Sequence, residues 1–201
     1  MIAAIVLAAG LGTRMRRIKP LIEFGGEPSL AILLRRLRAA GIARPIVVLG
    51  RSAKQIRDRV DLSEADVVLN PHPEHGMAGS LALGLRAVPV TADGTIVLHA
   101  DMPFIEKETI HAVLRTAERG ARIAAPSHRG RRGFPVYLSR AAFPELLATL
   151  AGDVGAREYI ARHTEDLVLA EVDGDGCLRD IDTPEDLSAA REESHAVHAD
   201  R

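Results

Sequence analysis

Short apolar runs alternate along the chain with segments in which apolar residues recur at helical spacing. The runs, which are typical of buried strands, cover residues 2–7, 46–49, 67–69, 95–98 and 123–125. The segments between them predict helices over about residues 29–40, 53–60, 80–88 and 107–118. Because strands that alternate with helices build a parallel sheet through right-handed crossovers, we expect an α/β fold with a mainly parallel sheet. Its ligands should lie at the carboxyl ends of the strands.

The pattern changes after residue 125. A turn is expected at 129–133, strands over 134–138, 167–171 and 177–180, and helices over about 141–150 and 154–163. The last two strands flank Asp173-Gly174-Asp175-Gly176, which predicts a hairpin. A final helix should begin at Thr183, with Pro184 at its first position. No linker interrupts the pattern, so we expect one domain over residues 1–190 and a polar tail over 191–201.

Composition narrows the class of protein. A chain of 201 residues with 47% hydrophobic residues is expected to fold as a globular domain. A net charge of −1 and only 3% aromatic residues argue against a nucleic-acid or membrane partner. The single cysteine, Cys177, excludes an internal disulfide and a four-cysteine zinc site. With no expected leader or membrane segment, a cytoplasmic location is the default expectation.

A glycine-rich loop follows the first predicted strand. Ala8 and Ala9 are small enough for a ligand to approach the backbone, and Gly10 and Gly12 favour a loop whose amide groups can turn toward an anion. Basic residues follow at once, namely Arg14, Arg16, Arg17 and Lys19. Together these features predict a triphosphate-binding site. The alternative is an ordinary strand-to-helix turn with solvated arginines.

This loop matches neither of two common phosphate-binding motifs. A Walker A loop ends in Gly-Lys-Ser/Thr, and this loop has no such ending. The dinucleotide fingerprint needs a third glycine where Met15 stands and an acidic residue where the chain has Gly50-Arg51. Because Arg51 could meet a 2′-phosphate, an NADP-dependent oxidoreductase stays open as a distant alternative.

An acidic residue follows the strand expected over 95–98. His99-Ala100-Asp101-Met102-Pro103 should lie at the edge of the sheet that carries the glycine loop. Mg²⁺ is usually held by one or two carboxylates together with phosphates and waters, so Asp101 is a candidate magnesium ligand. The competing interpretation is an aspartate that caps a helix before Pro103.

A turn-rich loop follows the strand at 67–69. It begins with Asn70 and ends near Gly79, where a flat base could approach the backbone, and Ser80, a plausible N-cap of the next helix. His72 and His75 also lie in this loop. We interpret both as loop histidines rather than metal ligands.

Several separated motifs resemble segments of MobA-like NTP transferases, in the order expected of that family. They are residues 7–15 with Lys19-Pro20-Leu21, 70–85, 131–136, 152–157 and 180–186. The resemblance covers residues 5 to about 187 and is greatest to molybdenum cofactor cytidylyltransferases. It implies a Rossmann-like three-layer sandwich of the nucleotide-diphospho-sugar transferase type. One departure is Phe134, which stands where the family usually carries histidine and removes a polar group from the second-substrate pocket.

The resemblance implies roles for individual residues. Catalysis is assigned to Lys19, Arg14 and Asp101, and the metal to Asp101 and Asp182, with Asp180 as the alternative to Asp182. The implied nucleotide-binding residues are Leu7, Ala8, Ala9, Gly10, Gly12, Thr13, Arg14, Lys19, Asn70, Gly79, Ser80 and Asp101. The implied acceptor-binding residues are Met102, Pro103, Arg132, Gly133, Phe134 and Pro135.

The implied activity is nucleotidyl transfer with Mg²⁺ as cofactor. A phosphate oxygen of the acceptor attacks the α-phosphorus of a nucleoside triphosphate, and pyrophosphate leaves. CTP is favoured because guanylyl-transferring relatives carry glycine where Ala9 stands. The favoured acceptor is molybdopterin, with a molybdenum hydroxylase as a candidate partner. A sugar-phosphate or other small-phosphate nucleotidyltransferase and a non-catalytic molybdenum cofactor-binding chaperone are the alternatives.

Overall fold

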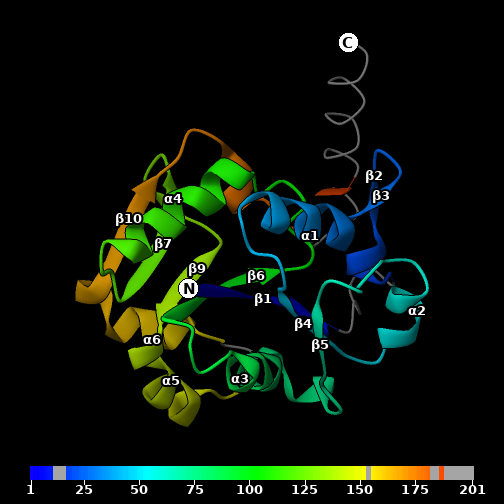
Figure 1. Cartoon of the computed structure of the whole chain (residues 1–201), viewed down its shortest axis with the longest axis horizontal. Coiled ribbons are helices and arrows are strands. Elements are labelled where there is room, and N and C mark those ends of the chain that lie inside the picture. Colours follow the sequence, from blue (N-terminus) through cyan, green and yellow to red (C-terminus); the bar gives the residue numbers. More distant parts are fainter. Residues whose placement is uncertain (11–16, 153–154, 182–185, 188–201) are drawn as a thin grey trace.

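The computed structural model describes residues 1–10, 17–152, 155–181 and 186–187. Within these residues the main sheet has eight strands in the order β10-β7-β9-β6-β1-β4-β5, with β8 paired to β7 (Figure 1). The strands are β1 (Ile2–Ala8), β4 (Ile46–Leu49), β5 (Asp66–Leu69), β6 (Gly94–His99), β7 (Ile123–His128), β8 (Arg131–Arg132), β9 (Val136–Ser139) and β10 (Leu167–Glu171). A separate two-stranded ribbon joins β2 (Glu23–Phe24) and β3 (Glu27–Pro28).

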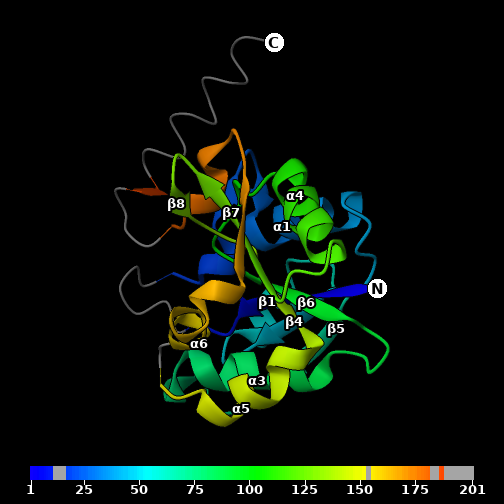
Figure 2. The ribbon, with the colours of Figure 1, turned by 90° about the vertical axis from the view of Figure 1, so that its left-hand side faces the viewer.

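Helices cover both faces of this sheet. They are α1 (Ser29–Ala39), α2 (Ala53–Arg57), α3 (Met77–Ala87), α4 (Lys107–Glu118), α5 (Phe143–Thr149) and α6 (Arg157–Arg162). Figures 1 and 2 show α1 and α4 over one face and α3, α5 and α6 over the other. Short 3₁₀ helices are η1 (Lys19–Leu21), η2 (Pro73–His75), η3 (Arg140–Ala142), η4 (Thr164–Asp166) and η5 (Asp175–Leu178). The three-layer α/β fold with a mainly parallel sheet is therefore confirmed.

Alternation along β1 explains why a hydrophobic core forms on each face of the sheet. Ala4 and Val6 point into the core beneath α1 and α4, whereas Ile5 and Leu7 point into the core beneath α3, α5 and α6. Successive side chains of a strand face opposite sides of a sheet, so an uncharged strand with helices on both faces is buried on both. The residues of β1 from Ala4 to Ala8 are all buried.

The strand order places a binding edge next to β1. β1 pairs in parallel with β4 on one side and with β6 on the other. The chain builds outward from β1 to β4 and β5, then returns to place β6 on the opposite side, so the strand order reverses between β1 and β6. In open α/β sheets this reversal leaves a crevice at the carboxyl ends of the two strands. The sheet departs from parallel pairing at β9, which runs antiparallel to both β6 and β7, and at β8, which runs antiparallel to β7.

Two local predictions were wrong. The expected strand at 177–180 is replaced by η5, and β10 pairs in parallel with β7 instead of forming a hairpin. The backbone of η5 lies directly against the residue Phe104. A Cβ on Gly176 would be only 2.1 Å from the carbonyl oxygen of Phe104. The helix expected from Ser80 begins at Met77, with Gly76 as its N-cap, so Ser80 does not cap it. The start of the last predicted helix, including Thr183, lies outside the described residues.

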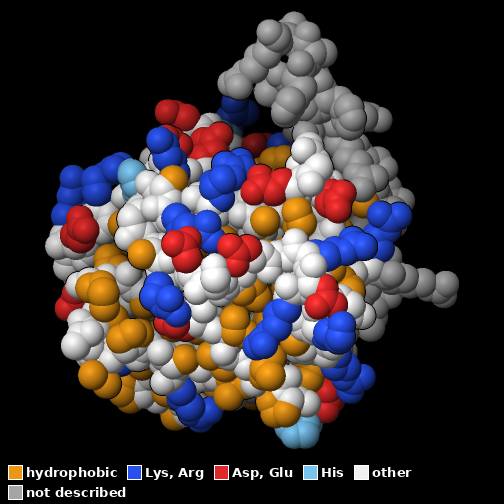
Figure 3. Space-filling model, turned by 45° about the vertical axis from the view of Figure 1, so that its right-hand side comes forward, with side chains coloured by type: hydrophobic (Ala, Val, Ile, Leu, Met, Phe, Trp, Pro, Cys, Tyr) orange, Lys and Arg blue, Asp and Glu red, His pale blue; other side chains and the backbone are white. Residues whose placement is uncertain are grey.

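The surface is mixed in charge. On the face drawn in Figure 3, basic and acidic side chains are interspersed and no broad area carries a single sign. Across the described residues no helix combines the length and apolar character that a membrane crossing requires.

Gly84 allows the close packing of α3 on the sheet. A Cβ there would lie 2.7 Å from Cγ2 of Ile5 and 3.3 Å from Cγ2 of Val48. We expect Gly84→Ala to lower the free energy of unfolding by about 1–3 kcal/mol through overpacking, as measured by urea denaturation. Gly79→Ala is the matched control in the same helix, because its Cβ would meet only Asn70 Nδ2, at 3.8 Å. Equal destabilisation by the two variants would contradict this explanation.

Candidate active site

Lys19 and Asp101 form an ion pair at the edge where β1 and β6 end. Lys19 Nζ lies 2.8 Å from Asp101 Oδ2, and the two side chains are 21% and 16% exposed. Lys19 begins η1, while Asp101 follows β6 by two residues. Segments 82 residues apart thus bring a cation and a carboxylate into one partly accessible space. The two side chains can serve opposite charges of one ligand, such as a phosphate and its counter-ion.

The backbone around Asp101 is held by three separate parts of the chain. Ser29 Oγ, at the start of α1, donates a hydrogen bond of 2.6 Å to the carbonyl oxygen of Ala100. The amide of Ala100 donates to the carbonyl of Leu7, and the amide of Ile181 donates to the carbonyl of Asp101 at 3.1 Å. These bonds fix the main chain that carries the Asp101 side chain, while Lys19 contacts its carboxylate.

Arg36 of α1 supports the turn after Asp101 from behind. Its guanidinium donates to the carbonyl oxygens of Pro103 and Ile105. Burial lowers the pKa of Arg36, but a guanidinium stays protonated in proteins, so it remains a donor. Sequence reasoning did not single out Ser29 or Arg36, because a serine and an arginine on an amphipathic helix carry no local sign of a distant carbonyl partner.

Met102 and Pro103 lie inside this turn. Both are buried, and the Met102 side chain is 3% exposed within the core beneath α1 and α4. Any contact of Met102 with an acceptor would therefore have to come from its backbone, and the acceptor-binding role of these two residues stays a prediction.

The glycine loop is described only at its start. Leu7, Ala8 and Ala9 are buried and Gly10 is exposed at the end of β1. A Cβ on Gly50, just after β4, would lie 2.8 Å from the carbonyl oxygen of Ala9, so the two strand ends approach closely. The predicted phosphate-binding residues Gly12, Thr13 and Arg14 lie outside the described residues. The nucleotide-binding role of this loop stays a prediction.

Asn70 and Ser80 bind each other. Asn70 Nδ2 donates to Ser80 Oγ at 2.9 Å, and Asn70 Oδ1 accepts from the amide of His72 at 2.9 Å. Both side chains are buried, at 6% and 5% exposed. The pair therefore fastens the loop after β5 to α3, and Gly79 lies beside it. The proposed contact of these three residues with a nucleotide stays a prediction.

Removal of the Asn70 side chain tests this fastening. We expect Asn70→Ala to lower the free energy of unfolding by about 1–3 kcal/mol, because it leaves buried polar groups unpaired. Ser80→Ala should cost less once Asn70 is already alanine, since the two side chains are partners. Additive losses in a double-mutant cycle, measured by urea denaturation, would contradict this coupling.

Phe134 lies beside His99, the last residue of β6. The two rings meet edge to face with centroids 4.7 Å apart. The amide of Phe134 donates to the carbonyl of Cys177 at 2.8 Å, and a Cβ on Gly133 would lie 2.3 Å from that same oxygen. Phe134 is thus fixed as a half-buried aromatic side chain beside the end of β6. Of the other residues predicted to bind an acceptor, Arg132 is exposed on β8 and Pro135 is buried.

The described residues supply a limited set of metal ligands and nucleophiles at this edge. Asp180 is exposed and precedes Ile181, whose amide binds the Asp101 carbonyl, while Asp182 lies outside the described residues. One firmly held carboxylate, with phosphates and waters, fits the usual coordination of Mg²⁺. Burial raises the pKa of the Cys177 thiol, which argues against a thiolate nucleophile.

Surface hollows do not by themselves locate this site. Two of them, of about 300 and 270 Å³, are lined by neither Lys19 nor Asp101: one lies between α1 and the start of α4, the other beside β8. The candidate site rests instead on its chemistry and on its position at the ends of β1 and β6.

Residues 4–167 match the family model described as MobA-like NTP transferase domain. The chain belongs to this family. The resemblance to MobA-like NTP transferases is therefore confirmed, and the matched region contains most of β1 together with Lys19, Asp101 and Phe134.

Individual relatives carry different names. The chain is 25% identical over 194 residues to nicotine blue oxidoreductase of Paenarthrobacter nicotinovorans, covering 92% of this chain and 94% of that protein. It is 34% identical over 123 residues to the bifunctional protein GlmU of Chromobacterium violaceum, covering 59% of this chain but only 26% of that protein. Among solved structures, Rv0371c of Mycobacterium tuberculosis H37Rv is 29% identical with a TM-score of 0.87, covering 95% of this chain and 97% of that one. A structure of Rv0371c in complex with manganese has a TM-score of 0.82.

Proposed function

We propose that the protein is a nucleotidyltransferase that moves a nucleoside monophosphate from a triphosphate to a phosphate-bearing acceptor and releases pyrophosphate. The observation that carries this proposal is the Lys19–Asp101 pair at the strand-order reversal. Membership of an NTP transferase family supports it. The transfer of a phosphoryl group needs positioning and charge neutralisation rather than a covalent nucleophile, and the buried thiol of Cys177 agrees with that requirement.

Each residue of the site has a role in this proposal. Lys19 neutralises the α-phosphate and the attacking oxygen, Arg14 holds the outer phosphates, and the amides around Gly10 and Gly12 donate to phosphate oxygens. Asp101 holds Mg²⁺, which neutralises phosphate charge when bound, and Asp182 or Asp180 is the second carboxylate. The manganese complex of Rv0371c supports a divalent cation in this family.

CTP is our proposed nucleotide and molybdopterin our proposed acceptor. Ala9, in place of the glycine of guanylyl-transferring relatives, supports CTP. The Phe134–His99 aromatic surface supports an acceptor with a planar ring. In this proposal the protein works in the cytoplasm and hands its product to a molybdenum hydroxylase.

A panel of triphosphates tests the nucleotide and the reaction together. CTP with Mg²⁺ should raise the melting temperature more than GTP, ATP or UTP, and pyrophosphate should appear only when a phosphorylated acceptor is added. Stabilisation by GTP but not by CTP would contradict the proposal that CTP is the nucleotide substrate. The absence of pyrophosphate with molybdopterin and with sugar 1-phosphates would overturn the transferase proposal.

An oxidoreductase is the second candidate function. It is favoured by one observation, the match over nearly the full length of both chains to a protein named nicotine blue oxidoreductase. Arg51, the residue that first suggested NADP, donates instead to Glu74 Oε2 at 3.1 Å, so it adds no support. Consumption of NADH or NADPH with a planar aromatic acceptor, measured by loss of nicotinamide absorbance, would decide for this function.

A further inference from the structure

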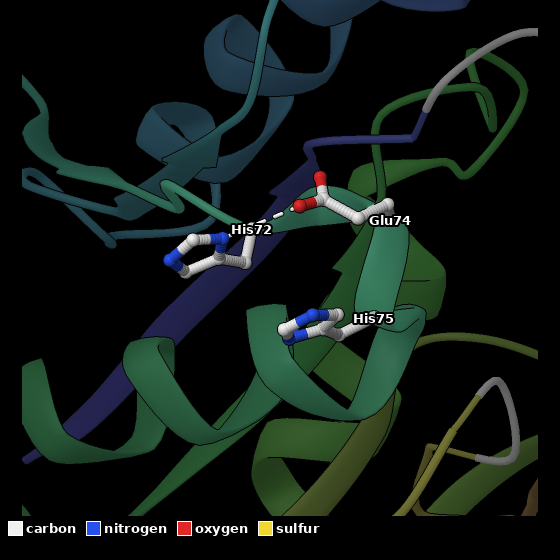
Figure 4. A group of neighbouring side chains, drawn as sticks. All are labelled: His72, Glu74 and His75. Atoms are coloured by element: carbon white, nitrogen blue, oxygen red, sulfur yellow. Dashed lines mark hydrogen bonds and ion pairs between the residues drawn. The ribbon is translucent and has the colours of Figure 1, made fainter.

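A cluster of potential metal ligands lies on the loop between β5 and α3. His72, Glu74 and His75 each offer one ligand atom, and these atoms all lie within 4.8 Å of one another (Figure 4). In the part of the chain that the structure describes, this is the only group of three or more His, Cys, Asp or Glu side chains so close together. All three side chains are exposed. None of them has a role in the proposed nucleotidyl transfer.

Two of the three ligand atoms are already separated by the distance expected of two donors on the same metal ion. His72 Nδ1 and Glu74 Oε1 are 3.2 Å apart, which is close to the spacing of about 3.3 Å between two donors on one tetrahedral Zn²⁺. The rings of His72 and His75 are stacked, with centroids 5.1 Å apart and planes inclined by 13°. For both ring nitrogens to meet at one ion, one of the two exposed rings must rotate about its side-chain bonds.

The backbone fixes the spacing of the three residues. The buried Asn70 side chain accepts from the amide of His72 at 2.9 Å. The following turn is the 3₁₀ helix η2, closed by the amide of His75 to the carbonyl of His72 at 3.1 Å. Gly76 then takes φ of 91°, which favours glycine and directs the chain into α3. The three side chains are therefore presented from one rigid turn rather than from a loose loop.

Arg51 orients the carboxylate. Its Nη2 donates to Glu74 Oε2 at 3.1 Å, while Oε1 faces His72. One oxygen is thus held by a neighbouring cation and the other is directed toward the imidazoles. An outer partner that fixes a ligand in this way is a common feature of metal sites.

We propose that His72, Glu74 and His75 bind one divalent transition-metal ion of the Zn²⁺ class. Two imidazoles and one carboxylate suit Zn²⁺, Ni²⁺ or Co²⁺, whereas Mg²⁺, Ca²⁺ and Mn²⁺ prefer oxygen ligands. The remaining coordination positions face solvent and are filled by water. Asp101 is not a member of this cluster, and it follows β6 whereas the cluster follows β5, with β1 and β4 lying between those two strands in the sheet. A bound ion would clamp the turn that leads into α3.

The test is metal binding to the purified full chain after removal of any affinity tag. Zn²⁺ is titrated in competition with a chromophoric chelator, and Co²⁺ binding is followed by its visible absorption. We expect one Zn²⁺ per chain, unaffected by millimolar Mg²⁺. Replacement of both His72→Ala and His75→Ala should abolish this binding. Glu74→Gln, which keeps the shape of the side chain, should weaken it at least about tenfold, and Arg51→Ala by about ten- to a hundredfold.

Matched controls use histidines outside the cluster. His111→Ala on α4 and the double replacement of His195→Ala and His198→Ala should each leave Zn²⁺ binding unchanged. Persistence of one tightly bound Zn²⁺ in the His72/His75 double variant would overturn the proposal, as would wild-type binding no tighter than that of the double variant. Because the readout is binding of the metal alone, the result is independent of whether the protein transfers a nucleotide.

Discussion

Lys19→Ala is expected to lower the rate of nucleotidyl transfer about 100- to 1000-fold while the protein stays folded. Lys19 lies in η1, which places its Nζ at the ends of β1 and β6. The ammonium group therefore needs no reorientation during the reaction. The loss of one preorganised charge of this kind typically costs that factor in rate. The measurement is pyrophosphate release at saturating triphosphate and acceptor, with circular dichroism as the check on folding.

A surface ion pair provides the matched control. Lys54 Nζ lies 2.8 Å from Asp58 Oδ2, the same separation as in the Lys19–Asp101 pair, but Lys54 is 87% exposed on α2. Lys54→Ala should leave the rate unchanged, because an exposed pair contributes little to stability or to a distant site. A Lys19→Ala enzyme with nearly wild-type activity would refute the role assigned to Lys19.

Asp101→Asn is expected to reduce transfer by a similar factor of about 100 to 1000 and to abolish its response to added Mg²⁺. Asparagine keeps the shape of the side chain but lacks the charge that a divalent cation requires. The Ser29, Leu7 and Ile181 hydrogen bonds involve only the backbone near Asp101, so the turn should keep its conformation. The measurement is the rate as a function of Mg²⁺ concentration.

The outcome for Asp101→Asn separates a metal ligand from an aspartate that only pairs with Lys19. If Asp101 served only to position Lys19, the variant would still respond to Mg²⁺ at the wild-type concentration. Asp58→Asn, in the surface pair, is the control and should behave as the wild type. An unchanged Mg²⁺ dependence in Asp101→Asn would remove this residue from the metal site.

Much of the fold could be predicted because its signals are local. The buried strands at Ile2–Ala8 and Ile46–Leu49 are uncharged, and the helix at Lys107–Glu118 has a regular apolar stripe, so pattern alone places them within a residue. The meeting of Lys19 and Asp101 follows from the same source, because both come after parallel strands whose carboxyl ends share one edge.

The errors arose where contacts between distant segments decide the structure. Nothing local in residues 177–180 reveals that Gly176 will press against Phe104 or that Phe134 will donate to Cys177. In the same way, α3 begins three residues early because Gly76 caps it and the amide of Ala78 binds the carbonyl of Gly152. Contacts that depend on the folded chain also explain why two further features were missed. These are the Asn70–Ser80 hydrogen bond and the cluster of His72, Glu74 and His75. From the sequence alone, this segment was interpreted only as a nucleotide-binding loop with two histidines that had no assigned role.

The antiparallel course of β9 brings a different part of the chain to the binding edge than the parallel strands do. A parallel strand presents to the binding edge only the residues that come after it, but β9 presents those that come before it, since Val136 pairs with Val97 near the end of β6. The segment that carries Phe134 therefore reaches the substrates from a different direction than the elements that carry Lys19 and Asp101. In the proposed reaction, a change at Phe134 would therefore alter the acceptor side of the site without moving Lys19 or Asp101.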